Sequence, residues 1–143
     1  MEILITNEQG HVPVTVFHVS GEIDVNTYEQ LEQRGRLEFA AGMRDLVLDL
    51  SQVSFISSAG LRAIHALFLL LRSDSPDESD EAMSRGLRDG TFKSQHLILF
   101  NPQPVVLNSL SYAGFDMYLQ IYHHDLHKAV ESFGMVAHAG KSK

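Results

Sequence analysis

The hydrophobic pattern of the chain changes its period several times, and each change predicts an element of secondary structure. Apolar and polar residues alternate in EILIT at 2–6 and in VPVTVFHV at 12–19. This period of two, with many β-branched residues, predicts two strands joined by a turn at 7–10. Three mostly apolar runs predict further strands: LVLDL at 46–50, QHLILF at 95–100 and MYLQIY at 117–122.

Between these strands the apolar residues recur at intervals of three and four, which predicts helices. The first helix covers 26–42, with Asn26 and Glu29 at the spacing of a capping box. Gly42 is a typical residue for its C-terminal end.

Three further helices follow in the same pattern. One begins at Ser57 or Ser58, either of which is a good N-cap, and ends near Arg72. The other two are predicted from 101–102 to about 114 and from 125 to about 136. Strand and helix therefore alternate through most of the chain, which is typical of an α/β domain with a largely parallel sheet. We expect one domain over residues 1–143.

The segment at 73–94 interrupts this alternation. Five of the eight residues from 74 to 81 are acidic, which favours a solvated loop or a disordered insert. A short extra helix is the alternative, because Ser75, Pro76 and Glu78 match an N-cap, a first helical residue and an early acidic residue.

Composition narrows the functional classes. The chain has no cysteine and a net charge of −7, which excludes thiol chemistry and argues against a nucleic-acid partner, since such partners select basic surfaces. It has neither a signal-peptide pattern at the N-terminus nor an apolar run long enough to span a bilayer. These features predict a soluble, cytoplasmic protein that does not associate with membranes.

The junction between the strand at 46–50 and the following helix is the strongest candidate for a site. Its turn is Ser57-Ser58-Ala59-Gly60. Free backbone N–H groups and the positive end of the helix dipole meet at such a turn, so an anion or a phosphoserine would be stabilised there. Gly60 would let another backbone or a nucleotide approach closely.

Three segments carry a resemblance to a known family: GEID at 21–24, LVLDL at 46–50 and VSFISSAGL at 53–61. In these segments, in their spacing and in the order of elements, the sequence resembles the STAS domain of bacterial anti-sigma-factor antagonists. The resemblance extends from about residue 2 to 135, apart from the insert. It implies a curved mixed sheet of four to five strands with about four helices, which lie on one side.

The resemblance also implies a partner-switching role in transcription. Such an antagonist binds an anti-sigma factor that is a serine kinase, and the kinase can phosphorylate it in the strand-to-helix turn. The added phosphate carries roughly 1.5 to 2 negative charges, which a desolvated interface would not accommodate. The residues implied for partner binding are Asp24, Ser57, Ser58, Ala59, Gly60 and Leu61.

The sequence departs from the family at the phosphorylated position. The family pattern is Asp-Ser-Ser-Gly-Leu or Asp-Ser-Thr-Gly-Leu, with the acceptor directly before the glycine. Here that residue is Ala59, and Ser57 replaces the aspartate. The candidate phosphorylation sites are therefore Ser58 and Ser57, although Ser58 is rotated by roughly 100° from the usual position.

This departure leaves two alternatives open. One is a scaffolding or sensory STAS protein of a stress-signalling assembly that is not controlled by phosphorylation. The other is a STAS module that binds a nucleotide at the start of the helix. The oligomeric state also stays open, with a homodimer as one alternative.

The remaining sequence features do not predict catalysis. His123 and His127 are four residues apart and would share one face of a helix, but no second pair of ligands accompanies them. There is no phosphate-binding glycine loop, no G-x-S-x-G motif and no paired-carboxylate motif. We therefore expect no metal, no cofactor and no enzymatic activity.

Overall fold

Five strands form one mixed sheet in the order β1-β2-β3-β4-β5. The computed structural model describes residues 1–74, 84–86, 88 and 93–134. Strand β1 is antiparallel to β2, and every later pair is parallel, which confirms the predicted α/β class. The strands are β1 (Glu2–Gln9), β2 (Pro13–Ile23), β3 (Leu46–Ile56), β4 (Leu97–Phe100) and β5 (Gln120–Tyr122).

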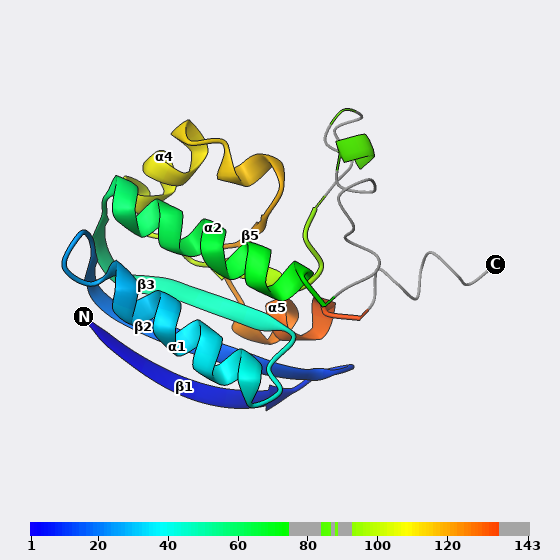
Figure 1. Ribbon diagram of the computed structural model, residues 1–143. Coiled ribbons are helices and arrows are strands. Elements are labelled where there is room, and N and C mark those ends of the chain that lie inside the picture. The colour runs from blue at the N-terminus through cyan, green and yellow to red at the C-terminus, as the bar shows by residue number, and fades with distance from the viewer. Residues whose placement is uncertain (75–83, 87, 89–92, 135–143) are drawn as a thin grey trace.

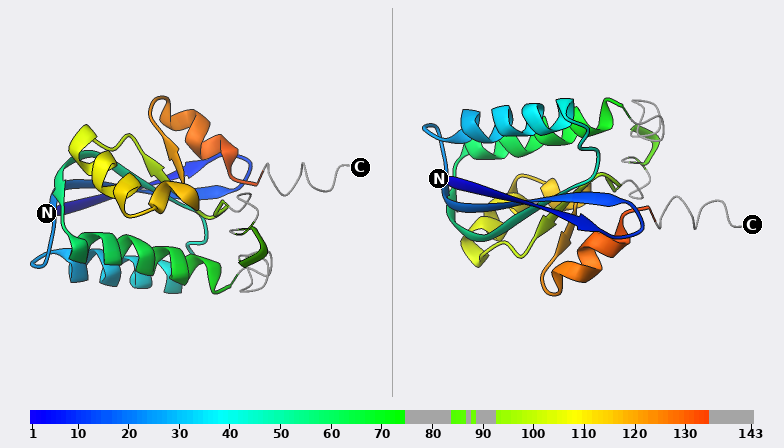
Figure 2. Two further views of the ribbon diagram at one scale, coloured as in Figure 1. Left: turned by 90° about the horizontal axis from the view of Figure 1, so that it is seen from above. Right: turned by 90° about the horizontal axis from the view of Figure 1, so that it is seen from below.

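The helices cover both faces of the sheet unequally. Helices α1, α2 and α4 pack on one face, and α5 packs on the other (Figures 1 and 2). Because the parallel strands follow one another in chain order, right-handed crossovers place their connecting helices on the same face. The resemblance implied helices on one side only, and α5 is the exception. The helices are α1 (Tyr28–Ala40), α2 (Ser58–Arg72), α4 (Pro104–Tyr112), α5 (Leu126–Ser132) and the 3₁₀ helix η2 (Phe115–Met117).

The alternation of side chains along β3 separates two apolar clusters. Leu46, Leu48 and Leu50 belong to the main core beneath α1 and α2. Val47 points to the other face, where it packs with Phe133 and other residues of the α5 region. The sheet therefore has apolar side chains on both faces in its centre, which explains why LVLDL reads as an almost continuous apolar run.

Two strands are longer than the sequence pattern predicts. Strand β2 continues past Val19 to Ile23, and β3 continues past Leu50 to Ile56. The extensions pair with each other, with register shifts between His18 and Ser20 and between Gly21 and Glu22. Such irregularities bend a strand and increase its twist without ending it. The first turn lies at 10–12 rather than at 7–10, and β5 begins at 120 because 115–117 form η2.

The two ends of α1 differ in how well they were predicted. The helix begins at Tyr28 with Thr27 as its N-cap, so the capping role predicted for Asn26 is wrong. At the other end Gly42 has a positive φ of 118°. The Met43 N–H donates to the Glu38 carbonyl at 2.9 Å, as in a Schellman motif.

The remaining predictions for helices agree in type but not in length. Helix α4 is shorter than the predicted 101–114, and the predicted end of the last helix lies outside the described residues. Most of the acidic insert, for which a loop and an extra helix are the alternatives, also lies outside the described residues. At its start, Asp74 Oδ2 accepts a hydrogen bond from Arg44 Nε at 3.0 Å.

Candidate functional site

The turn between β3 and α2 has a well-defined helix cap. Ser57 is the N-cap residue, and its Oγ accepts a hydrogen bond from the Gly60 N–H at 3.3 Å. The Ser57 carbonyl accepts the Leu61 N–H at 2.9 Å. The predicted start of this helix is therefore confirmed, with Ser57 as the cap and Ser58 as the first helical residue.

The turn between β2 and α1 lies directly beside it. The Ser57 N–H donates to the Ile23 carbonyl at 2.9 Å, which joins the two turns. Within its own turn, the Asp24 N–H donates to Thr27 Oγ1 at 2.9 Å. Asp24 Oδ1 accepts the Asn26 N–H, also at 2.9 Å. The Asp24 carboxylate thus stabilises its own turn, which is joined to the Ser57 turn through the backbone of Ile23.

Gly60 permits the close packing of these two turns. A Cβ atom at Gly60 would lie 2.4 Å from the Ile23 carbonyl oxygen and 2.6 Å from Ile56 Cγ1. Both distances are shorter than any real Cβ contact, so only glycine fits without a shift of the backbone. The backbone that approaches Gly60 therefore belongs to the end of β2 in the same chain.

The residues of the Ser57 turn differ in their accessibility. Ser58 is exposed, Ser57 is half-buried, and Ala59 is only 6% exposed. The position directly before Gly60, where the resemblance implies a phosphorylated hydroxyl, thus holds a buried methyl group in this chain. Of the two candidate hydroxyl groups, Ser58 is the more accessible, because Ser57 Oγ is also engaged as the helix cap.

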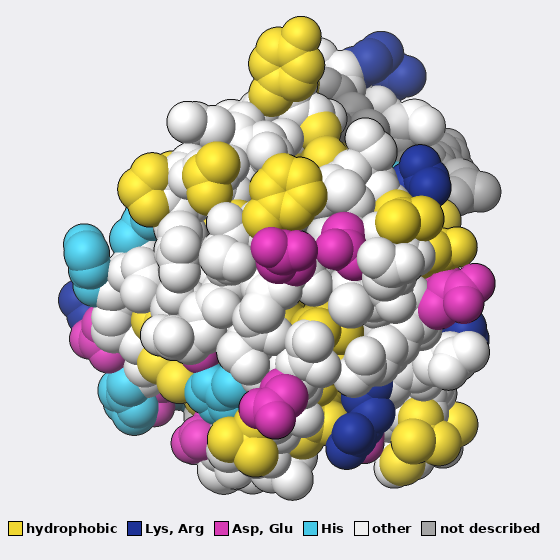
Figure 3. All heavy atoms as spheres, turned by 90° about the vertical axis from the view of Figure 1, so that its left-hand side faces the viewer, with side chains coloured by type: hydrophobic (Ala, Val, Ile, Leu, Met, Phe, Trp, Pro, Cys, Tyr) yellow, Lys and Arg dark blue, Asp and Glu magenta, His cyan; other side chains and the backbone are white. Residues whose placement is uncertain are grey.

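Sequence reasoning missed two apolar side chains at this end of the molecule. Val25 is 70% exposed and Phe55 is 46% exposed. Figure 3 looks at this end and shows hydrophobic and acidic side chains next to one another near its centre. Glu22 is the cross-strand partner of Phe55. The sequence could have indicated the exposure of Val25, because this residue lies within the polar turn Asp24–Thr27, where an apolar side chain has little core to contact.

A polar network lies on the face of the sheet that is opposite to α1 and α2. His18 Nδ1 is 2.7 Å from Asp49 Oδ2, and His18 Nε2 is 3.1 Å from Thr6 Oγ1. Asp49 Oδ1 also accepts the Ser51 N–H at 3.0 Å and the Ser51 hydroxyl at 2.8 Å. The side chain of the buried Asp49 therefore links β3 to β2, and through His18 to β1. The LVLDL motif gave no indication of these partners.

The histidine pair near the C-terminal end does not form a shared helical face. Helix α5 begins at Leu126, so His123 lies in the preceding loop and only His127 is helical. His127 Nε2 lies 3.4 Å from Glu131 Oε2 instead. Among the described residues, no group of three or more His, Cys, Asp and Glu side chains is arranged to hold a metal ion.

Comparison with known families and structures agrees with the fold. The model of the STAS domain family matches residues 4–75. A solved structure of an anti-sigma factor antagonist from Mycobacterium paratuberculosis is 26% identical, with a TM-score of 0.68 over 92% of each chain. A Thermotoga maritima protein assigned as an anti-sigma factor antagonist is 19% identical, with a TM-score of 0.69 over 92% of this chain and 93% of that one.

A third similar structure adds a more distant comparison. The Bacillus anti-sigma factor antagonist SpoIIAA, in its unphosphorylated form, is 17% identical, with a TM-score of 0.55 over 90% of this chain and 96% of that one. No curated protein sequence matches the chain significantly. In the part of the chain that the structure describes, every helix is too short or too polar to cross a membrane.

Proposed function

Because this chain belongs to the STAS domain family, we propose that it acts as an anti-sigma-factor antagonist through the two adjoining turns at one end of the sheet. The observation that carries the proposal is the pair of exposed apolar side chains, Val25 and Phe55, beside the Ser57 turn. The similarity to the Mycobacterium paratuberculosis antagonist supports it. We define the turn surface as Asp24, Val25, Phe55, Ser57, Ser58 and Leu61.

The proposed partner is an anti-sigma factor with serine kinase activity. The exposed part of Phe55 and the side chain of Val25 would supply apolar area to the interface, since such anchors contribute most of the binding energy in many complexes. Asp24 would contribute a polar contact at the edge of this apolar area. Gly60 and Ala59 would act indirectly, because both are buried and fix the position of the turn.

Phe55→Ala is expected to weaken the complex with the anti-sigma kinase about 5- to 30-fold. Truncation of a central apolar contact in an interface typically costs about 1–2 kcal/mol. Isothermal titration calorimetry with the purified kinase measures the change. Leu4→Ala is the matched control, because Leu4 is an exposed apolar residue on β1, outside the turn surface, and is 67% exposed. Equal losses in both variants would exclude Phe55 as a specific contact.

Phosphorylation of Ser58 is the proposed switch of this interaction. Ser58→Asp is expected to weaken kinase binding at least about tenfold, because the new charge has to be desolvated at the interface. Folding should not suffer, since a carboxylate at the first helical position interacts favourably with the helix dipole. Ser58→Asn introduces a side chain of the same shape as aspartate but without the charge. It should bind the kinase nearly as tightly as the unmodified chain does in the same calorimetric titration.

Mass spectrometry after incubation with the kinase and ATP tests the modification itself. We expect phosphate on Ser58. Phosphate on Ser57 alone would move the switch to the helix cap. Binding of the kinase without phosphate at either serine would refute the switch and favour the scaffolding alternative. If the kinase does not bind the unmodified chain, the proposed antagonist function itself is wrong.

A further inference from the structure

A hollow of about 470 Å³ lies between α2 and the segment 113–118, which runs from the end of α4 through η2. We call it the α2–η2 groove. Figure 1 shows these two segments side by side on the same face of the sheet. Its walls are formed by apolar side chains, with Leu61, Ala66 and Leu69 on α2 and Ala113 and Phe115 opposite. A site for a small ligand has this size and this mostly apolar lining.

The polar groups of the groove are few, and they come from two elements. Arg62 and His65 lie one turn apart on α2, and Tyr118 completes the lining. His65 Nδ1 is 3.0 Å from the Tyr118 hydroxyl oxygen. Burial raises the pKa of Tyr118 to about 12, so its hydroxyl keeps its proton at neutral pH. Leu69 lies about one turn beyond His65 on α2, so the end of the groove at Leu69 is more apolar than the end at Arg62.

The charge of the groove differs from that of the whole chain. The sequence has 18 acidic residues against 11 lysines and arginines, yet none of the described residues that line the groove carries a carboxylate. Arg62 is exposed, and it forms no ion pair with any carboxylate of the described residues. A guanidinium group without an acidic partner, beside apolar walls, is suited to bind a carboxylate.

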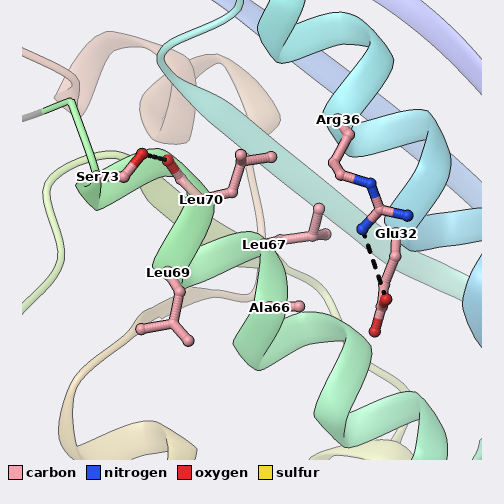
Figure 4. A pocket seen from close by; sticks show the side chains of 7 residues that line it. All are labelled: Glu32, Arg36, Ala66, Leu67, Leu69, Leu70 and Ser73. Atoms are coloured by element: carbon pink, nitrogen blue, oxygen red, sulfur yellow. Dashed lines mark hydrogen bonds and ion pairs between the residues drawn. The ribbon is translucent and has the colours of Figure 1, made fainter.

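A second hollow, between α1 and α2, provides a contrast. Its volume is about 320 Å³, and it is lined by Leu67 and Leu70 among other residues. Its arginine, Arg36, is already paired with Glu32, with 3.7 Å between Nη1 and Oε1 (Figure 4). The positive charge of Arg36 is therefore compensated within the chain, whereas Arg62 in the α2–η2 groove has no such ion pair with the described residues.

We propose that the α2–η2 groove binds a small amphipathic carboxylic acid, with its apolar tail between Leu69 and Phe115 and its carboxylate at Arg62. The polar groups near the carboxylate would be His65 and the Tyr118 hydroxyl. This proposal does not depend on the proposed partner, because the groove shares only Leu61 with the turn surface and its ligand binding can be tested on the isolated chain.

The test is a titration of the ¹⁵N-labelled chain with octanoate, followed by two-dimensional NMR. Octanamide, which has the same tail but no charge, is the comparison ligand. We expect saturable shifts of the amides of 61–69 and 113–118, with octanoate binding about tenfold more tightly than octanamide, as one charge-assisted hydrogen-bonded contact predicts.

Three variants make the test specific. Arg62→Gln should weaken octanoate binding about tenfold and leave octanamide binding unchanged. Lys128→Gln, the control, removes the same charge from α5 on the other face of the sheet and should change neither. Ala113→Trp should fill the groove and abolish binding of both ligands. Its fold is checked by its NMR spectrum.

Several outcomes would overturn the proposal. They are the absence of saturable shifts in the groove, equal affinities for octanoate and octanamide, and equal effects of Arg62→Gln and Lys128→Gln. The first outcome would leave a segment of a partner protein as the occupant to test. None of these results bears on kinase binding at the turn surface, so the two proposals fail separately.

Discussion

Gly60→Ala is expected to lower the free energy of unfolding by about 2–4 kcal/mol, since overpacking against a fixed backbone atom is costly. The new Cβ would meet the Ile23 carbonyl oxygen at 2.4 Å. That carbonyl also accepts the Ser57 N–H, so relief of the clash would separate the two turns. Urea unfolding followed by circular dichroism measures the loss. Kinase binding should fall with it, because the turn surface is built on this contact.

Gly35→Ala is the matched control for this prediction. Gly35 is also a buried helical glycine, and a Cβ there would lie 2.2 Å from Leu67 Cδ2. This neighbour is the tip of a side chain, which can change its rotamer, so we expect a loss of only about 1 kcal/mol or less, part of it offset by helix propensity. If both variants lose the same stability, the Ile23 carbonyl is not the critical contact.

Asp49→Ala is expected to lower the free energy of unfolding by about 1–3 kcal/mol, because it leaves half-buried partners without their acceptor. The Ser51 N–H, the Ser51 hydroxyl and the His18 ring all lose a hydrogen bond. Asp49→Asn should lose about half as much, since an amide oxygen can still accept from Ser51. The same unfolding experiment measures both variants.

Asp116→Ala serves as the comparison for Asp49. Asp116 is an exposed acid in η2, and substitutions of this kind usually change stability by no more than about 0.5 kcal/mol. A loss at Asp116 similar to that at Asp49 would contradict the importance of the buried network.

The order of the strands and helices could be predicted because it depends on local periodicity. Leu46, Leu48 and Leu50 mark a buried strand in the sequence, and they are buried in the structure. Ser57 could be identified as a helix cap because capping depends on a few neighbouring residues. The lengths of β2 and β3 could not be predicted, because Ser20 and Gln52 continue their strands through cross-strand pairing, with each other and, for Ser20, with Glu2 of β1.

The candidate site was only partly predictable for the same reason. Asp24 and the turn residues 57–61 were identified through a family resemblance. Which of their side chains are exposed could not be predicted in this way. That Ala59 is buried while Ser58 is exposed follows from how the end of β2 packs on α2. The α2–η2 groove is formed by α2 and the segment 113–118, which are about fifty residues apart in sequence. Hydrophobic periodicity describes local structure only, so it could not predict this groove.

The order of the sheet also affects how the chain can fold during synthesis. Each strand pairs with the strand that precedes it in the chain, so every strand that leaves the ribosome finds its partner already made. Pairing in chain order keeps the sequence separation between partner strands smaller than pairing of more distant strands would, which favours faster folding. A longer connection before β4 slows this little, because doubling a loop costs only about 0.6 kcal/mol in closure entropy. The connection between α2 and β4 is therefore a place where the family can gain residues while the turn surface, at the other end of α2, stays unchanged.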